Sequence, residues 1–431
     1  MEKASGAART YFTNLVSRDD AKFPAHSKLE VIKQAQVGLA VAPVSDVLSV
    51  VDEIDFGGGL DLVAGGPPCQ GFSLAGRRIK DDPRNKLVWE FLSFVEKTNP
   101  RIVIIENVVG MGRKFDPSDE GSPFANVQEA LATTKGAGYV VNGLSINAMH
   151  YGAPQFRPRL MVIGVRKDVA DALEKPDRRE LWASHFLDSK KPIPWFAPHP
   201  TRETAVTLED AMAGLPGGKK GVSDSEYGRL MNDAGVWHLT TRAGKPLNNE
   251  MRRHRPPTVY RFQFAQLLAK MGLSGRALGP LAPETLDKEL AKLDLYFKAH
   301  QDVELRAGER VFRTAAEVEE QIRALRNKKH SQRVLKWASP SHTVVTIPDD
   351  YIHPDQPRTF SVRELARLQG FPDDFEFMGK ATTGGTDRRS SVPQYSQVGN
   401  AVSPLVGFAM GQLVERILGQ ADAVTESSQV A

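Results

Sequence analysis

The stretch Leu60–Ser73, LDLVAGGPPCQGFS, decides how the first part of the chain is interpreted. It opens with a short apolar run bounded by glycines, which is typical of a buried strand. Two prolines then restrict the backbone, and the glycines beside them allow the backbone to approach a ligand closely. Cys69 therefore stands on a stiff turn just after a strand, where ligands bind in an open α/β sheet.

The sequence alone leaves two interpretations of Cys69 open. It is the only cysteine among 431 residues, which excludes an intrachain disulfide framework and a zinc site built from four cysteines. Cys69 is either a small hydrophobe at a tight turn or a reactive thiol. Such sparse cysteine usage fits a reducing, cytoplasmic setting, and we expect no metal site.

The overall composition is that of a soluble globular protein. Hydrophobic residues make up 41% and charged residues 25% of the chain, which excludes a fibre, a coiled coil and disorder throughout. No apolar run approaches the roughly 20 residues of a membrane span, and the opening MEKASGAARTYF lacks the apolar core of a signal peptide. The net charge of +4 permits an anionic partner such as nucleic acid without requiring one.

Strands and helices are expected to alternate around Cys69. Beyond the strand at 60–64, apolar periodicity predicts a helix over 84–98, and apolar, β-branched runs predict strands over 101–105, 139–146 and 160–165. Strands separated by helices favour βαβ units, and hence an α/β fold with a largely parallel sheet.

The rest of the chain divides by composition. Residues 1–166 form the first part of the α/β domain. Residues 167–350 are rich in Pro, Gly and charge, and predict a second, irregular domain; its basic stretches 241–262 and 321–336 are either anion-binding or simply solvated helix faces. Residues 351–420 return to regular structure, with Ser361 and Glu364 as a capping box and a final helix over 401–418. Residues 421–431 are expected to be a flexible tail.

Two more segments carry candidate chemical groups, and the first of them, with Glu106, is expected at the same sheet edge as Cys69. Glu106 follows the apolar run RIVII and is costly to bury without a role or a partner, although it could simply cap the next segment. In QFRPR, Arg157 and Arg159 alternate and so point to one side of an extended strand. Paired guanidinium groups suit a phosphate or a polarised carbonyl; the alternative is two surface arginines on an edge strand.

Together these segments resemble the DNA (cytosine-5) methyltransferase family of bacterial type. Five family motifs occur in order, and they are GGPPCQGFS at 65–73, ENV at 106–108, QFRPR at 155–159, RELARLQGFPDDF at 363–375 and QVGNAV at 397–402. The resemblance covers about residues 1–165 and 339–420. It implies a Rossmann-like S-adenosylmethionine-dependent methyltransferase sheet, N-terminally truncated, with a smaller, irregular target-recognition domain at 167–350.

The resemblance also implies a mechanism. Cys69 would add to C6 of cytosine, which makes C5 nucleophilic enough to take a methyl group from S-adenosylmethionine. Glu106 would hydrogen-bond N3 and the exocyclic amine, and Arg159, supported by Arg157 and Gln155, would hold the base carbonyl. Because C6 is inaccessible in a stacked duplex, the base must be flipped out, and the loop 71–85 is the candidate lid.

The family pattern further implies two sets of binding residues. The expected cofactor contacts are Glu2, Asp46, Gly66, Pro68, Leu87, Asn400 and Ala401. The expected DNA contacts are Gln70, Ser73, Arg77, Arg78, Arg252, Arg253 and Arg255.

One part of the family pattern has no counterpart in this sequence. The family normally begins with a strand and a Phe-x-Gly-x-Gly turn that holds the methionine part of the cofactor, and no such segment precedes Gly57. Three explanations stay open: an upstream start codon, a separate small polypeptide that supplies the motif, or a remnant that binds DNA without transferring a methyl group.

These alternatives define the expected function and partners. The leading hypothesis is methylation of double-stranded DNA in the bacterial cytoplasm at the nucleoid, either alone or in a restriction-modification system with a cognate restriction endonuclease. A non-catalytic DNA-binding protein is the second hypothesis, and a tRNA methyltransferase is the third. No membrane partner is expected.

Overall fold

The protein is described here from a computed structural model. It describes residues 4–67, 86–116, 118–136, 138–175, 178–233, 235–237, 239, 245–273, 276, 278–329, 332–382 and 392–430. Cys69 and the rest of 68–85 lie outside these ranges.

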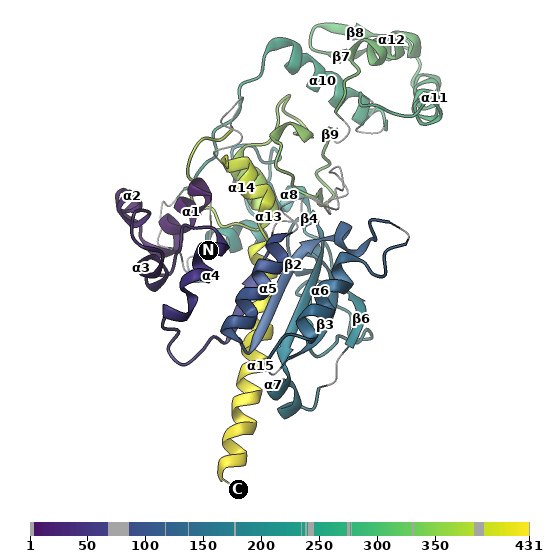
Figure 1. The fold of residues 1–431 in the computed structure, drawn as a ribbon. Coiled ribbons are helices and arrows are strands. Elements are labelled where there is room, and N and C mark those ends of the chain that lie inside the picture. The colour runs from purple at the N-terminus through teal and green to yellow at the C-terminus, as the bar shows by residue number, and fades with distance from the viewer. Residues whose placement is uncertain are drawn as a thin grey trace.

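A five-stranded sheet forms the centre of the lower part of the molecule (Figure 1). Its strands, in spatial order, are β1 (Leu62–Gly65), β2 (Ile102–Val108), β5 (Pro158–Arg166), β3 (Tyr139–Asn147) and β6 (Arg178–Ala183). The expected strands are confirmed within a few residues at their ends. β1 is parallel to β2, and β3 to β6, while β5 runs against both of its neighbours.

The expectation of a largely parallel sheet is therefore wrong for β5. The connection from β3 to β5 spans only residues 148–157 and holds no long helix. A parallel crossover needs a dozen or more residues, usually with a helix, so this short link returns the chain antiparallel. Arg159 consequently enters the sheet beside the carboxyl end of β2, where its register partner is Val108.

Helices cover both faces of the sheet because β2 alternates its apolar side chains. Val103 and Ile105 pack with α5 (Lys86–Thr98) and α6 (Pro123–Ala132) on one face. Ile102 and Ile104 pack on the other face with α7 (Lys167–Ala172) and α15 (Pro404–Val430). Figure 1 shows α5 and α6 in front of the strands and α15, in yellow, extending beyond the sheet toward the C-terminus.

The final helix differs from its prediction. It begins at Pro404 and continues to Val430, through residues that were expected to form a flexible tail. One contact near this end is an ion pair between Arg101 and Asp422, and Ala421 is buried against the sheet. A small and polar composition therefore did not indicate where the helix stops.

The N-terminal region adds short helices beside the sheet. They are α1 (Ser5–Tyr11), α2 (Phe23–His26), α3 (Val31–Gln36) and α4 (Val44–Val50). The Thr10 hydroxyl donates to Gln397 at 2.6 Å, and the Asn14 amide donates to the carbonyl of Glu376 at 2.7 Å. The start of the chain is thus bound to its C-terminal part.

The return segment forms a second core with residues from the middle of the chain. It contains α13 (Val362–Gln369) and α14 (Gln394–Asn400), which pack with α8 (Leu208–Met212) and α9 (Glu226–Asn232). The predicted capping box of Ser361 and Glu364 is confirmed, and Gly370 ends α13 with a φ of 92°, which glycine adopts without strain.

The part drawn at the top of Figure 1 has a separate core. It is built from α10 (Pro256–Lys270), α11 (Pro283–Ala299), α12 (Ala315–Leu325), the hairpin β7 (Leu305–Ala307) and β8 (Arg310–Phe312), and the pair β9 (Arg333–Val334) and β11 (Tyr351–Ile352). The expectation of an irregular middle is wrong for 256–325, which is mainly helical. The packing also places the boundary of the sheet domain later than residue 167. β6 joins the sheet, and residues up to Ala197 pack in its core.

A small parallel pair joins the two parts. β4 (Gln155–Phe156), on the link between β3 and β5, pairs with β10 (Ser341–His342). Figure 1 shows β4 where the lower part of the molecule meets the upper part. Among the described helices, no single one has both the length and the apolar composition of a membrane span; only the bent pair Gln394–Asn400 and Pro404–Ser427 passes that test.

Candidate active site

Glu106 and Arg159 meet at the carboxyl end of β2. Oε1 of Glu106 lies 2.8 Å from Nε of Arg159, and the two side chains are only 16% and 17% exposed. A carboxylate this far from water needs a charged or hydrogen-bonding partner, and Arg159 provides it. The antiparallel course of β5 creates this contact, because it brings Arg159 alongside the end of β2.

The end of β1 lies against the same carboxylate. A Cβ atom added to Gly66 would stand 3.1 Å from Oε2 of Glu106, and one added to Gly65 would stand 2.7 Å from the Phe91 ring. Glycine is therefore required at Gly65 by packing and favoured at Gly66 by the nearby carboxylate. The Asn107 amide also reaches the carbonyl of Pro67 at 3.4 Å, so β2 helps to hold the backbone that leads to Cys69.

Gln155 is buried and fully used in holding the surrounding chain. Its amide nitrogen donates to the carbonyl of Leu368 at 2.8 Å and to the Gln369 side chain, and its oxygen accepts from the amide of Val344 at 2.9 Å. Gln155 thus connects its own segment with those of Val344 and of Leu368 and Gln369.

Arg157 is 2% exposed and donates to backbone carbonyls. Its two terminal nitrogens reach the oxygens of Val344, Gly399 and Ala401, each at 2.9 Å. Burial, and then the nearby positive charge of Arg159, lowers the pKa of Arg157 to about 9. Arg157 therefore anchors the segment that leads into α15.

A small cavity lies among these groups. It has a volume of about 10 Å³, and its lining includes Glu106, Arg157, Arg159, Val402 and Ser403. The prediction that Arg157 and Arg159 face the same side is confirmed, since both line this cavity. The site thus combines residues from β2, from the link before β5 and from the turn before α15.

The motif at 363–375 supports this assembly through buried charges. Arg367 forms a bidentate ion pair with Asp373, with both side chains 2% exposed. Arg358 forms a second bidentate pair with Glu364, at 2.7 Å for each contact. These pairs fix α13, and the carbonyl of Leu368 in α13 receives the hydrogen bond from Gln155.

The predicted cofactor residues differ in exposure, and two of them lie outside the described residues. Gly66 and Asn400 are exposed, Asp46 is exposed in the first turn of α4, and Leu87 is partly buried at the second position of α5. The carbonyl of Ala401 already accepts from both Arg157 and Gln369. Glu2 and Pro68 lie outside the described residues.

Among the predicted DNA contacts, Arg253 and Arg255 are exposed. Arg252 instead pairs with Asp349 at 2.6 Å and stands over the Tyr395 ring. Gln70, Ser73, Arg77 and Arg78 lie outside the described residues, as do Cys69 and the expected lid 71–85.

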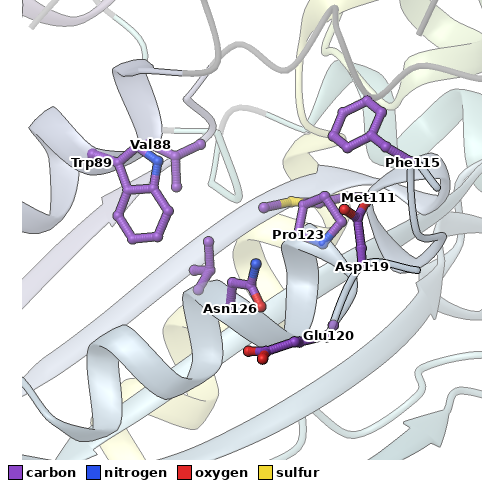
Figure 2. A pocket seen from close by; sticks show the side chains of 10 residues that line it. Val88, Trp89, Met111, Phe115, Asp119, Glu120, Pro123 and Asn126 are labelled. Carbon is purple, nitrogen blue, oxygen red and sulfur yellow. The ribbon is translucent and has the colours of Figure 1, made fainter. Parts of the chain in front are cut away.

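A larger cavity of about 370 Å³ opens between α5 and α6 (Figure 2). Trp89 lines one side, Phe115 and Asp119 the other, and Met111 and Asn126 lie between them. No residue predicted for the site lines this cavity, although Leu87 is two positions before Trp89.

Sequence reasoning missed three residues that hold the site together. Asn147 accepts from the backbone amide of Arg157 at 3.0 Å, Asn107 reaches Pro67, and Gln369 bonds with both Gln155 and Ala401. Asn107 and Gln369 lie inside the ENV and RELARLQGFPDDF motifs, so a closer look at motif amides could have found them. Asn147 carries no such signal.

Comparison with known proteins identifies this arrangement. The profile of the family described as C-5 cytosine-specific DNA methylase matches residues 40–416. The chain belongs to that family. The C-5 cytosine-specific DNA methylases are S-adenosylmethionine-dependent α/β methyltransferases that act on cytosine in DNA, and the resemblance drawn from the five motifs is confirmed.

Two curated relatives extend this finding. The type II methyltransferase M.AgeI of Thalassovita gelatinovora is 31% identical over 83% of this chain and 83% of its own length. The type II methyltransferase M.DdeI of Desulfomicrobium norvegicum is 26% identical over 86% of this chain and 76% of its own length. The solved structure of S. pombe Dnmt2 methyltransferase is 14% identical with a TM-score of 0.40, over 96% of this chain and 97% of that one.

Proposed function

We propose that this chain methylates C5 of cytosine in duplex DNA, with Cys69 as the nucleophile. The observation that carries the proposal is the Glu106–Arg159 pair at the carboxyl end of β2, beside the backbone that leads to Cys69. A carboxylate and a guanidinium group at the sheet edge, with a thiol two residues beyond Pro67 in the sequence, suit a reaction in which charge develops on a ring.

The protein groups have distinct roles in this reaction. The Cys69 thiolate forms a bond to C6, which pushes electron density toward C5. Glu106 hydrogen-bonds the N3 edge of the base, and Arg159 holds the carbonyl oxygen. When the proton on C5 has left to a base, the ring electrons expel Cys69 and the C6–sulfur bond breaks. Bound S-adenosylmethionine supplies the methyl group. The cytosine must leave the duplex stack before it can react.

Several described residues fit the cofactor. The lack of a side chain at Gly66 leaves room beside Glu106 that a Cβ would narrow to 3.1 Å. Asp46 and Asn400 present exposed polar groups. We assign the backbone at Gly66 and the side chains of Asp46 and Asn400 to holding S-adenosylmethionine, with Leu87 as an apolar contact.

Phosphate contacts are assigned to the exposed arginines near α10. Arg253 and Arg255 are exposed, whereas Arg252 forms an ion pair with Asp349. Contacts of this kind position a protein on DNA without reading its sequence.

We also propose that another polypeptide adds a strand and a glycine-rich turn along β1. Within the described residues β1 pairs only with β2, and Leu62 is 38% exposed beside the core residue Ile102. An open apolar edge of this kind is a template for strand pairing. The variant Leu62→Lys should abolish DNA methylation in cells and leave the unfolding temperature of the isolated chain nearly unchanged.

The matched control for that variant is Leu181→Lys on β6, the strand at the opposite edge of the sheet. Bisulfite sequencing of host DNA reads both variants. Methylation by Leu62→Lys at the wild-type level would contradict the proposed strand. Because the curated relatives are type II methyltransferases, we further propose a cognate restriction endonuclease and a cytoplasmic location where DNA is present.

The central test is a covalent trap. Duplex DNA that contains 5-fluorocytosine cannot lose fluorine from C5 as it loses a proton, so the enzyme should remain bonded through Cys69 when S-adenosylmethionine is present. The adduct should be absent with Cys69→Ser, while DNA binding should persist. Failure to trap the wild-type chain in an extract of its host, where the proposed polypeptide is present, with saturating cofactor and with DNA that includes its target, would disprove the mechanism.

A further inference from the structure

Ser403 is a buried serine at the start of α15. It directly precedes Pro404, the first residue of that helix, and it is 2% exposed. A serine in this position usually accepts a hydrogen bond from a backbone amide of the first helical turn, as Ser122 does for α6 and Ser225 for α9. Within the part of the chain that the structure describes, Oγ of Ser403 has no hydrogen-bond partner. This hydroxyl therefore does not serve to cap its own helix.

A second buried polar atom of the candidate site has the same property. Arg157 is 2% exposed, and its two terminal nitrogens donate to backbone carbonyls. Its Nε, in contrast, reaches no acceptor among the described residues. A buried donor or acceptor without a partner costs free energy, and ordered water commonly satisfies such groups in folded proteins. The two atoms do not bond to each other, so a bridge between them must come from a third group.

The residues that carry these two atoms line the same small cavity. Its volume is about 10 Å³, and Glu106 and Arg159 line it as well. A single water molecule needs a space of roughly 10–15 Å³ and about two to four polar partners. The lining supplies Nε of Arg157, the hydroxyl of Ser403 and the carboxylate of Glu106. The cavity is therefore suited to one water molecule and is too small for a base or a cofactor.

Buried water molecules are common in proteins, about one for every 27 residues, so a water site alone implies no function. The neighbours of this cavity make it different. Oε1 of Glu106 lies 2.8 Å from Nε of Arg159, and a second fixed hydrogen bond to the same carboxylate would restrict its rotation. A group that binds a substrate keeps its productive orientation when supporting bonds of this kind hold its side chain.

We propose that one ordered water molecule connects the turn before α15 with the Glu106–Arg159 pair. It accepts hydrogen bonds from Nε of Arg157 and from the hydroxyl of Ser403, and it donates one to the carboxylate of Glu106. Ser403 is thus a positioning residue, because it acts on Glu106 through the water and does not touch the DNA. The inference rests on the proposed function, in which Glu106 binds the edge of the cytosine.

The water site is tested by crystal structures of the full-length wild-type chain and of Ser403→Val, at a resolution that shows ordered water. The wild type should have one density peak within hydrogen-bonding distance of both Nε of Arg157 and Oγ of Ser403. Valine has no hydroxyl, and its methyl groups take up space, so the peak should be missing in Ser403→Val. A wild-type map without the peak, or a peak that persists in Ser403→Val, would overturn the proposal.

The positioning role is tested by comparing Ser403→Thr with Ser403→Val, because these side chains have nearly the same size and shape and differ in the hydroxyl. The kcat of the threonine variant should exceed that of the valine variant roughly 2- to 12-fold, the equivalent of one hydrogen bond, while KM for DNA stays equal. Ser403→Ala, which adds no atoms, should fall below wild type by the same factor and keeps the comparison available if the larger side chains do not fit. Equal kcat values with and without the hydroxyl would contradict the role of Ser403.

The matched control is Ser225→Ala, which removes a serine that does cap its helix. The amide of Gly228 donates to Oγ of Ser225 at 2.8 Å. Ser225→Ala should lower the unfolding temperature and leave kcat at the wild-type level, because Ser225 does not line the cavity. The same behaviour in Ser403→Ala, a loss of stability without a loss of kcat, would show that Ser403 is merely structural.

The two readouts separate this inference from the proposed function. The density peak requires neither DNA nor cofactor nor turnover. A wild-type chain that shows the peak, loses it in Ser403→Val and transfers no methyl group would contradict the proposed function and support the water site. Methyl transfer by a wild-type chain whose map lacks the peak would support the proposed function and overturn the inference.

Discussion

Glu106 illustrates how one contact decides the character of a residue. Its carboxylate follows an apolar run and is largely shielded from water. It can be buried there because Arg159 approaches from the antiparallel strand β5. In such surroundings a charge pair is strong but depends on both members. Replacing either member of the pair should therefore affect both the stability of the fold and the binding of the substrate.

Replacing Glu106 by Gln should slow methyl transfer strongly. The amide keeps the shape but cannot exchange a proton with N3 as electron density builds up on the ring, so kcat should fall by roughly 10²- to 10⁴-fold. The rate is measured by transfer of labelled methyl groups to DNA. Asp52→Asn, which removes the partner of Lys97 in an exposed pair, is the control, and an equal loss in both variants would contradict a specific role.

Arg157 should matter for folding before it matters for chemistry. Arg157→Met would remove the donors of the carbonyls of Val344 and Gly399, while Ala401 keeps its bond from Gln369. Each buried acceptor left without a donor costs about 1–3 kcal/mol, so with two such carbonyls the free energy of unfolding should fall by roughly 2–6 kcal/mol. Urea denaturation measures this, and an unchanged midpoint would refute it.

The roles of Gln155 and Arg157 show where sequence reasoning ends at this scale. The pattern QFRPR indicated which side chains share a side. Their actual partners, Val344, Leu368 and Gly399, come from segments far along the chain, and no local period encodes such distances. The place of Glu106 at the carboxyl end of β2 could be predicted from the strand pattern, but the approach of Arg159 depends on the antiparallel course of β5, which the pattern did not predict.

Helix α13 is held in place by buried charged side chains as well as by apolar packing, which its apolar pattern alone does not indicate. All eight of its residues are buried, including Arg363 and Arg367. Burial lowers the pKa of Arg363 to about 10, yet its guanidinium donates to the carbonyl of Pro372 at 2.6 Å. The helix is thus held by specific bonds to the chain that follows it.

A double-mutant cycle should expose this dependence. Arg367→Met leaves Asp373 charged and buried, which should cost about 3–5 kcal/mol of unfolding free energy. Adding Asp373→Leu removes the stranded charge and should recover a large share. Urea denaturation of the two single variants and the double variant gives the coupling, and additive losses would show that the pair does not act as a unit.

The sequence predicted some elements well and α10 poorly, for a physical reason. The strands of the sheet and the capping box at Ser361 carry short-range signals, and the structure has them. In α10, Phe262, Phe264 and Gln266 are buried together, so apolar residues do not fall on one stripe. A helix enclosed on several sides loses the 3.6-residue pattern by which helices are found.

At the scale of the whole molecule, stability should fall in mild acid. Burial is the main cause that lowers the pKa of five described histidines, one of them to about 4, whereas in the unfolded chain these groups have a pKa near 6.5. Between those values the unfolded state binds more protons, so the free energy of unfolding decreases as pH falls below about 6.5. These residues are His150, His199, His254, His342 and His353.

Urea midpoints at pH 7.5 and at lower pH values test this expectation. The variant His150→Gln should lose less stability on acidification than the wild type, because it lacks the histidine whose pKa is lowered to about 4. The control is His300→Gln, which replaces the exposed histidine at the C-cap of α11. A midpoint that does not move between pH 7 and pH 5 would contradict the assignment.

The turn before α15 has a consequence for biosynthesis. Arg157 and Arg159 leave the ribosome well before Gly399 and Ala401, the segment that Arg157 anchors. At roughly 5–20 residues per second, that delay lasts on the order of tens of seconds. During it, the sheet face of Ile104 and Ile163 awaits the helix that will cover it. The growing chain therefore carries an exposed apolar surface, a target for chaperones, and acquires its reactive site only as synthesis closes.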